Sequence, residues 1–257
     1  MSRKSKITFT IIAWTLAAAF SGPAWAYQEV AVTDGGNISG TVKFVGSMPK
    51  LEPIVLTQDN EACGKAVSSE FLIANPQSKG LKNTVVFIEN IEKGKKLEVK
   101  PAVLDNSKCL FVPHVQAVHL GATLDVKNSD PILHNTHSYL GSVTVFNLAL
   151  PMQGQVLKRK ITKPGPIRVQ CDAHPHMSAW VVAVDHPYFS VTDEHGNFQL
   201  TGIPPGTYKI VAWHEPWKVK GTDKGGRLLY EPVDGVRIVQ ELTVPSKGEA
   251  KITFEFK

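Results

Sequence analysis

The apolar positions of this chain alternate with polar ones along most of its length. In NISGTVKFVG, at residues 37–46, Ile38, Val42 and Phe44 are separated by polar or small neighbours. Short runs such as NTVVFIENI, CLFVPHVQAVHL and SVTVFNLAL are rich in valine and aromatic residues, and Gly, Pro, Asn and Asp separate them. This pattern predicts an all-β protein built as a sandwich or barrel.

The pattern also divides the chain. The segment at 188–217 reads as three strands separated by two turns, DEHG at 193–196 and IPPG at 203–206, and VRIVQELTVP and AKITFEF add further strands. Glycine supplies the turn torsions, and proline ends ladder pairing. We therefore expect one β domain at 84–185, a smaller β-sandwich at 186–257 and an N-terminal β extension at 27–83.

Residues 1–26 are typical of an export signal. Three basic residues precede an apolar run at 7–20, and Ala24 and Ala26 indicate cleavage before Tyr27. The run is shorter than the roughly 20 residues of a membrane span, so no stable insertion is expected, although an uncleaved anchor is the alternative. A periplasmic location follows.

Cleavage also changes the charge. It reduces the 28 basic residues to 25 against 23 acidic ones, so the formal net charge falls from +5 to +2. The lysines are scattered along the chain as on a solvated surface, and no nucleic-acid partner is expected.

Three cysteines fit an oxidising compartment. Cys63 and Cys109 have no C-x-x-C motif or histidine pair nearby, and a disulfide between them is the preferred interpretation. Cys171 is then left over. It is either a buried free thiol or a residue with chemistry of its own.

The motif QCDAHPHM, at residues 170–177, places Cys171, His174 and Met177 on one hairpin loop between the strands GPIRVQ and AWVVAV. A thiolate, an imidazole and a thioether together suit copper. NSDPILHNTH offers His134 as a further ligand. The sequence predicts one mononuclear type 1 copper ion, with His134, Cys171 and His174 in the trigonal plane and Met177 axial.

The motifs around His134 and Cys171 resemble those of a known family of proteins. FVPHVQAVHLGATLDVKNSDPILHN from Phe111 and PGPIRVQCDAHPHM from Pro164 resemble the cupredoxins, the blue-copper proteins of plastocyanin and azurin type. The resemblance implies a Greek-key β-sandwich, and it implies that Asn135 hydrogen-bonds across to the cysteine loop. Fewer residues separate His174 from Met177 than in plastocyanin-like members, which bears on the axial distance, the colour and the potential.

The second block resembles a carboxypeptidase regulatory-like (transthyretin-like) domain. The pattern T-D-x-x-G-x-F-x-L-x-x-I-P-P-G-x-Y, from Thr192 to Tyr208, carries that resemblance. It identifies a scaffold and no chemistry.

Other assignments of the histidines stay open. His176 rivals Met177 as the fourth ligand, and a zinc site made of His134, Cys171, His174 and His176 is the alternative metal centre. A second copper or a rim site near His114 and His137 is also conceivable. No role is assigned to His119, His186, His195 and His214.

Two functions follow from these predictions. The first is a one-electron carrier that exchanges electrons with a cytochrome c or a dehydrogenase, with His174 or His176 on an exposed loop as the exit. The second is a polymer- or partner-binding module in which copper is structural or stored. Its aromatic platform would use Trp213, Trp217, Tyr188 and Tyr208. An enzyme is not expected, because the H-C-H motif of multicopper oxidases is absent from the sequence.

Overall fold

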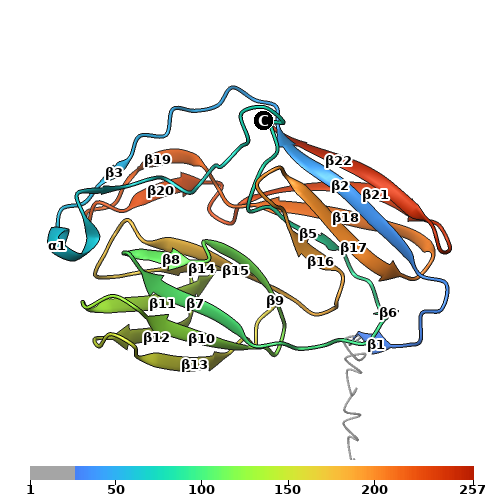
Figure 1. Ribbon diagram of the computed structural model, residues 1–257, viewed down its shortest axis with the longest axis horizontal. Coiled ribbons are helices and arrows are strands. Elements are labelled where there is room, and N and C mark those ends of the chain that lie inside the picture. Colours follow the sequence, from blue (N-terminus) through green and yellow to red (C-terminus); the bar gives the residue numbers. More distant parts are fainter. Residues whose placement is uncertain (1–26) are drawn as a thin grey trace, which may run out of the picture.

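The computed structural model describes residues 27–257, so the expected export signal at 1–26 lies outside the described residues. The described chain is almost entirely β, which confirms the predicted fold class (Figure 1). Its single helix, α1 (Asn60–Cys63), is a short turn of chain. No helix within 27–257 has the length and apolar character needed to cross a membrane.

The first sandwich consists of a four-stranded and a five-stranded sheet. The four-stranded sheet has the order β13-β10-β7-β8, with bounds β7 (Ala102–Ser107), β8 (Leu110–Val112), β10 (Thr123–Asn128) and β13 (Val156–Lys160). The other has the order β12-β11-β14-β15-β9, with bounds β9 (Val115–His119), β11 (His134–Leu140), β12 (Val143–Leu150), β14 (Gly165–Gln170) and β15 (Ser178–Val184). Neighbouring strands are often distant in sequence, and the chain crosses between the sheets as in a Greek key.

The second sandwich is built from both ends of the chain. One sheet has the order β16-β5-β18-β21, with bounds β5 (Val85–Ile88), β16 (Phe189–Val191), β18 (Gly206–His214) and β21 (Val236–Val244). The other has the order β17-β2-β22, with bounds β2 (Gly36–Phe44), β17 (Asn197–Ile203) and β22 (Glu249–Phe256). The alternating residues Ile38, Val42 and Phe44 point from β2 into its core.

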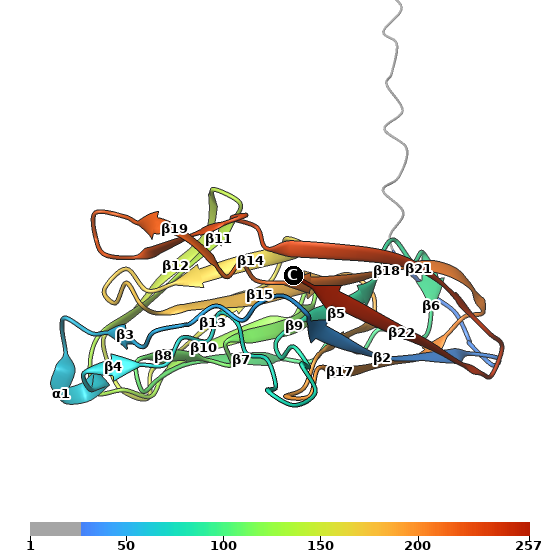
Figure 2. The same ribbon diagram turned by 90° about the horizontal axis from the view of Figure 1, so that it is seen from above.

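The N-terminal strands do not form a separate layer. β2 runs parallel to the last strand, β22, along its whole length, as Figure 2 shows. β5 was expected to begin the first β domain at residue 84, but it pairs with β18 and β16 in the second sandwich. The physical reason is that the valines of β5 complete a buried sheet there, so Val85, Val86 and Ile88 are fully buried.

β15 joins the two sandwiches. Ala179, Val181 and Ala183 face the core of the first sandwich. Trp180 and its neighbours on the opposite face pack against β5 and β18, and the rings of Trp180 and Trp213 meet edge to face at 5.1 Å. A strand buried on both faces must be continuously apolar, which explains the run AWVVAV.

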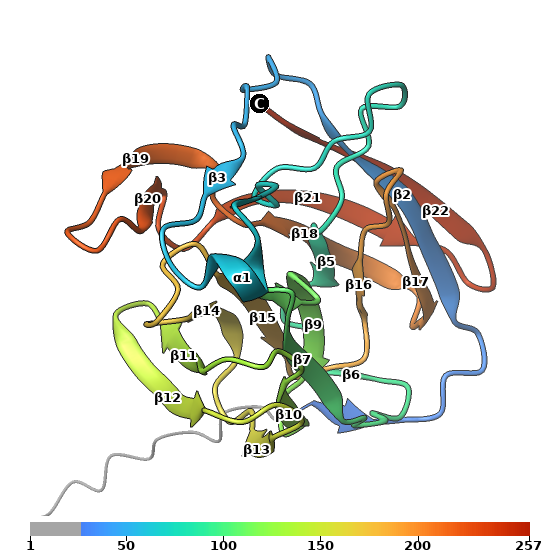
Figure 3. The ribbon, with the colours of Figure 1, turned by 60° about the vertical axis from the view of Figure 1, so that its left-hand side comes forward.

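The remaining strands form short pairs: β1 (Gln28–Glu29) with β6 (Lys93–Gly94), β3 (Ile54–Val55) with β4 (Ala66–Val67), and β19 (Lys218–Thr222) with β20 (Leu228–Glu231). Figure 3 shows α1, β3 and the β19–β20 hairpin near the β14 end of the first sandwich. The predicted disulfide is present: Cys63, the last residue of α1, is bonded to Cys109 in the β7–β8 turn. Closing a 46-residue separation stabilises the fold by roughly 3 to 4 kcal/mol on a chain-entropy argument.

Candidate metal centre

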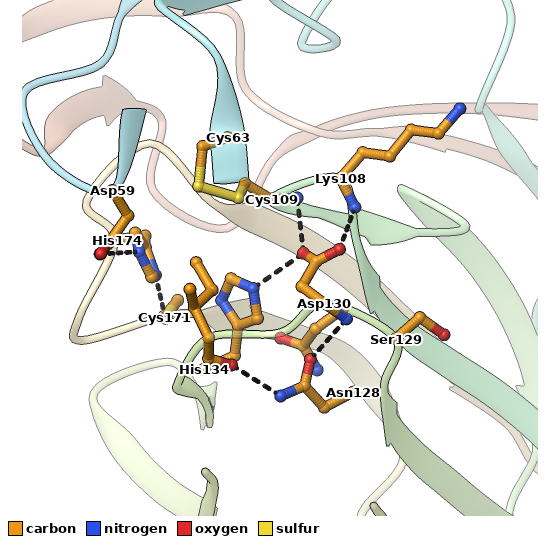
Figure 4. Close-up of polar contacts among 12 residues, drawn as sticks. Asp59, Cys63, Lys108, Cys109, Asn128, Ser129, Asp130, His134, Cys171 and His174 are labelled. Carbon is orange, nitrogen blue, oxygen red and sulfur yellow. Dashed lines mark hydrogen bonds and ion pairs between the residues drawn. A yellow bond between two sulfur atoms is a disulfide. The ribbon is translucent and has the colours of Figure 1, made fainter. Parts of the chain in front are cut away.

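Three of the predicted ligands converge at one end of the first sandwich. His134 is the first residue of β11, Cys171 directly follows β14, and His174 lies in the loop between β14 and β15. One ligand atom from each residue lies within 4.8 Å of the other two, and all three side chains are buried (Figure 4). The loop is compact, because the N–H of Met177 donates to the carbonyl of His174 at 3.0 Å.

Asp130 fixes the orientation of His134. Its carboxylate accepts a hydrogen bond from His134 Nε2 at 2.9 Å, so Nε2 carries a proton. Nδ1 of His134 is buried and has no partner among the described residues. The lone pair of Nδ1 is therefore the one available to a metal ion.

Asp59, which comes from a distant part of the chain, orients His174 in the same way. Its carboxylate accepts from His174 Nε2 at 3.0 Å, and Nδ1 of His174 faces the sulfur of Cys171 at 3.6 Å. A carboxylate on the far nitrogen of a ligating histidine is the usual way in which proteins hold such a ring. Both imidazoles thus present Nδ1 to one thiol.

The surroundings of Cys171 favour its thiolate. Burial alone raises the pKa of this thiol, but the neighbouring rings of His134 and His174 and the N–H of Asn135 outweigh burial and lower the pKa from 9.0 to about 6. The negative sulfur in turn raises the pKa of His174. A thiolate is the protonation state that a soft metal requires.

Asn135 links the two halves of the site. Its N–H donates to Cys171 Sγ at 3.4 Å, and its side-chain oxygen accepts from the N–H of Asp172 at 2.8 Å. This is the hydrogen bond across to the cysteine loop that the cupredoxin resemblance implies. It holds the first residue after β14 at a fixed position relative to β11.

The two rivals for the fourth position differ in their surroundings. Met177 is fully buried in the same core cluster as Cys171. Nε2 of His176 instead lies 3.0 Å from the carbonyl of Cys109, to which it donates. Burial, the largest influence, lowers the pKa of His176 to about 4, so its ring is neutral.

His174 is buried rather than exposed, which corrects the expected exit through that residue, whereas Asp172 in the same loop is exposed and His176, the other expected exit, is half-buried. His174 is only 1% exposed. Gln58 donates to the carbonyl of Ala173, next to the Asp59 contact. From the opposite side, Arg227 in the β19–β20 hairpin donates to the carbonyl of Cys171 at 2.6 Å.

The structure does not bring His114 or His137 into this group. His114 is buried with its Nε2 2.5 Å from Glu215. His137 is paired with Asp172 at 3.0 Å and stacks on Tyr139. Within residues 27–257 neither belongs to a converging set of three ligands. A second set contains Cys109, Asp130 and His134, but its cysteine is in the disulfide and has no free thiolate.

Three functional contacts have little or no signal in the sequence. Asp130 lies in the NSDP stretch just before His134, where a short polar turn is the only indication. Asp59 and Arg227 come from distant segments, and only the disulfide at Cys63 hints that the first of these approaches the site. The donor set that results, two imidazoles, a thiolate and a nearby thioether, fits copper chemistry.

The lowered pKa of Cys171 gives a testable pH dependence. We expect the thiolate absorbance of metal-free protein to titrate with a midpoint of about 6, with the Cys171→Ser variant as the baseline. Because the folded-state pKa lies below the unfolded one, the stabilisation from this group is complete above the unfolded pKa. It is lost as the pH falls through about 6. A midpoint near the ordinary thiol value would contradict the hydrogen-bonding account.

Fold and site together define an all-β protein of two sandwiches with a buried His–Cys–His cluster. The family model for the second β-sandwich domain of NOMO1-like subunits of the BOS complex matches residues 152–225. The match covers less than half of the chain and extends from the end of the first sandwich into the second. No curated protein sequence matches the chain.

Solved structures of copper proteins are similar over part of the chain. A purple cupredoxin from Nitrosopumilus maritimus is 20% identical and covers 32% of this chain and 99% of its own, with a TM-score of 0.30. An oxidised amicyanin variant is 28% identical and covers 33% of this chain and 82% of its own, with a TM-score of 0.29.

A copper-containing nitrite reductase from Thermus scotoductus SA-01 is 22% identical over 35% of this chain, with a TM-score of 0.30. The aligned part is only 24% of the reductase. Each likeness is confined to about a third of the chain, so the functional assignment depends on the geometry of the site itself.

Proposed function

We propose that this protein binds one copper ion through His134, Cys171, His174 and Met177 and acts as a one-electron carrier. The observation that supports the proposal is the convergence of three buried ligand atoms within 4.8 Å, with the other nitrogen of each imidazole held by a carboxylate. Bound copper would supply a type 1 Cu(I)/Cu(II) couple.

Copper is preferred to zinc because of the fourth position. A zinc site would need His176, whose Nε2 is engaged with the carbonyl of Cys109. Met177 offers a soft thioether, which suits copper and has no place in an ordinary zinc site. Met177 is buried beside Cys171 in the same cluster.

The frame around the ligands suits electron transfer. His134 begins a paired β-strand, the cysteine loop is held by Asn135, and the disulfide fixes the segment that carries Asp59. A ligand set that does not move between oxidation states needs little reorganisation. The role is therefore assigned to electron carriage and not to catalysis.

The export signal predicted at 1–26 supports a periplasmic role with a cytochrome c or a dehydrogenase as partner. Because His174 is covered, contact with the partner is assigned to the edge beside His134. Leu133 is 49% exposed and Met152 is 64% exposed. His134 pairs with Leu150 across β11 and β12. Leu133 and Met152, which flank these two residues in sequence, therefore lie at the same end of the hairpin.

Electron exchange with a reduced c-type cytochrome tests the proposal. Oxidised, copper-loaded protein should bleach in stopped flow as the haem is oxidised. Replacing Leu133 by Glu or by Lys should slow the second-order reaction about tenfold, which corresponds to about 1.4 kcal/mol. Either charge acts in the same direction, because the expected contact is apolar.

Val143→Glu provides the matched control. Val143 is 68% exposed and lies at the opposite end of the β11–β12 hairpin. Its replacement should leave the rate unchanged, and the copper spectrum should be the same in all three variants. The proposal would be abandoned if the cytochrome did not reduce the protein, or if Val143→Glu slowed the reaction as much as Leu133→Glu.

The structure offers less support for the binding module. Trp213 is 2% exposed, Trp217 6% and Tyr188 0%, so three of the four aromatics named for its platform are buried. They fill the core and the junction of the second sandwich instead.

A further inference from the structure

A second cluster of ligand-type side chains lies beside the candidate metal centre. One ligand atom from each of Cys109, Asp130 and His134 lies within 4.8 Å of the other two, and all three side chains are buried. Cys63 brings a further sulfur to the same place through its bond to Cys109, as Figure 4 shows. The two sulfurs are not free to bind a metal in the oxidised protein, because they are bonded to each other.

Hydrogen bonds hold the members of this cluster together. Oδ2 of Asp130 accepts from the N–H of Cys109 at 2.8 Å and from Nε2 of His134 at 2.9 Å. Oδ1 of Asp130 accepts from the N–H of Lys108 at 2.7 Å. Nε2 is therefore the nitrogen of His134 on the side of this cluster, whereas Nδ1 is on the side of Cys171. The turn at 108–109 and the start of β11 keep the donors close together without a metal ion.

We propose that reduction of the disulfide creates a zinc site made of Cys63, Cys109, Asp130 and His134. Two thiolates, an imidazole and a carboxylate are donors that zinc takes in four-coordinate sites. Bonds of about 2.0 to 2.3 Å to a tetrahedral ion place neighbouring donors about 3.5 Å apart. Donors that already lie within 4.8 Å of one another close around the ion with small movements. The site goes beyond the electron-carrier role, since His134 is the one residue that it shares with the proposed copper ligands.

The cysteine in α1 offers the point of attack for a reductant. No residue of α1 is buried, and Cys63 is half-buried, whereas Cys109 is fully buried. A dithiol attacks the sulfur of Cys63 and displaces Cys109, and the second thiol of the reductant then displaces Cys63. Two electrons pass from the dithiol to the disulfide bond. The two protons of the dithiol end on Cys63 and Cys109, and the reductant leaves as its own disulfide.

The zinc site competes with copper for His134. Cys63 and Cys109 each lose a thiol proton to solvent when they bind zinc. His134 gives the lone pair of Nε2 to zinc, so its proton moves to Nδ1, the atom on the side of Cys171. Asp130 exchanges its contact with Nε2 for a bond to the ion. Reduction in the presence of zinc therefore removes His134 from the proposed copper ligands.

Zinc titration of the metal-free Cys171→Ser chain tests the proposal without the thiolate of the copper cluster. One sample stays oxidised, and the other is reduced with a dithiol that is then removed under argon. In competition with a chromophoric chelator, the reduced sample should bind zinc at least about a hundredfold more tightly, because thiolates carry most of the affinity. Co²⁺ used in place of zinc should give a thiolate charge-transfer band in the reduced sample. Adding His134→Ala should weaken zinc binding to the reduced sample by at least about tenfold, since even the loss of a residue that orients a ligand costs this much.

Two variants that lack the disulfide without any reductant form a matched pair in the same background. Cys63→Ser leaves the thiol of Cys109 in the cluster, and Cys109→Ser leaves only the thiol of Cys63 in α1. Both lose the same cross-link, but Cys63→Ser should bind zinc at least about tenfold more tightly. The proposal is overturned if the reduced and oxidised samples bind zinc equally, if His134→Ala has no effect, or if the two single-thiol variants bind zinc alike.

Discussion

Replacing Cys171 by serine is expected to abolish the intense thiolate-to-copper charge-transfer band of the Cu(II)-loaded protein. The band requires a sulfur donor, and Cys171 is the only cysteine of residues 27–257 outside the disulfide. A serine hydroxyl is nearly isosteric but is a hard donor that stays protonated at neutral pH. The loss should therefore be complete, and visible absorption of the loaded protein measures it directly.

The loop itself supplies the control. His174→Ala removes the ring whose Nδ1 faces the sulfur, and the band should be lost or strongly altered. His176 lies two residues from His174, and its ring donates to the Cys109 carbonyl. The band should therefore persist in the His176→Ala variant. A colourless Cu(II) protein, or equal damage from both histidine variants, would contradict the ligand assignment.

Met177→Leu tests the axial position within the same experiment. It exchanges one buried apolar side chain for another of similar volume, so the fold should tolerate it. Copper should remain bound with a raised reduction potential. An unchanged potential would mean that the thioether is not a ligand.

Local patterns in the sequence were sufficient to predict the fold class and the placing of Cys171 and His174 on one loop. Alternation at Ile38, Val42 and Phe44 defines a strand and its buried face, and the structure places all three in the core. Cys171 and His174 share a loop because the strands around them are adjacent. Such predictions concern residues close in sequence, where spacing alone restricts geometry.

Strand partners could not be predicted in the same way. A period of two says which side of β5 is buried but not which strand it pairs with, and both sandwiches had room for a valine-rich strand. The structure pairs Val85 with Trp213 and Val191, far along the chain. The boundary expected at residue 84 was therefore drawn before a strand that belongs elsewhere.

The residues that hold the candidate ligands in place, Asp59 and Arg227, could not be predicted from the sequence for a related reason. Asp59 reaches His174 only because the disulfide holds α1 beside the β7–β8 turn, and Arg227 reaches the loop only because the β19–β20 hairpin folds back from the second sandwich. Neither residue has a motif of its own. The consequence is functional, since these contacts bury a histidine that was expected to be exposed.

Replacing Asp130 by alanine should lower copper affinity by about 10- to 100-fold, the usual cost of losing a carboxylate that orients a ligating histidine. Asp130 accepts from His134 Nε2 at 2.9 Å, from the N–H of Cys109 at 2.8 Å and from the N–H of Lys108 at 2.7 Å. One side chain therefore connects a proposed ligand to the turn that carries the disulfide. Two backbone donors would also lose their partner, which lowers the free energy of unfolding by on the order of 3 kcal/mol.

The Asp130→Asn variant separates ligand orientation from stability. With its oxygen in the Oδ1 position, asparagine still accepts from the N–H of Lys108, although its amide then faces both the N–H of Cys109 and His134, so chemical denaturation should show a smaller loss than for alanine. Its amide donates where the carboxylate accepts, which favours the ring tautomer of His134 with the proton on Nδ1, the atom needed by the metal. Copper affinity should therefore remain low, as measured by competition with a chelator. Asp125→Ala, which removes a carboxylate 3.6 Å from Lys158 within the four-stranded sheet, should change neither property strongly. Wild-type affinity in Asp130→Asn would show that Asp130 does not set the tautomer of His134.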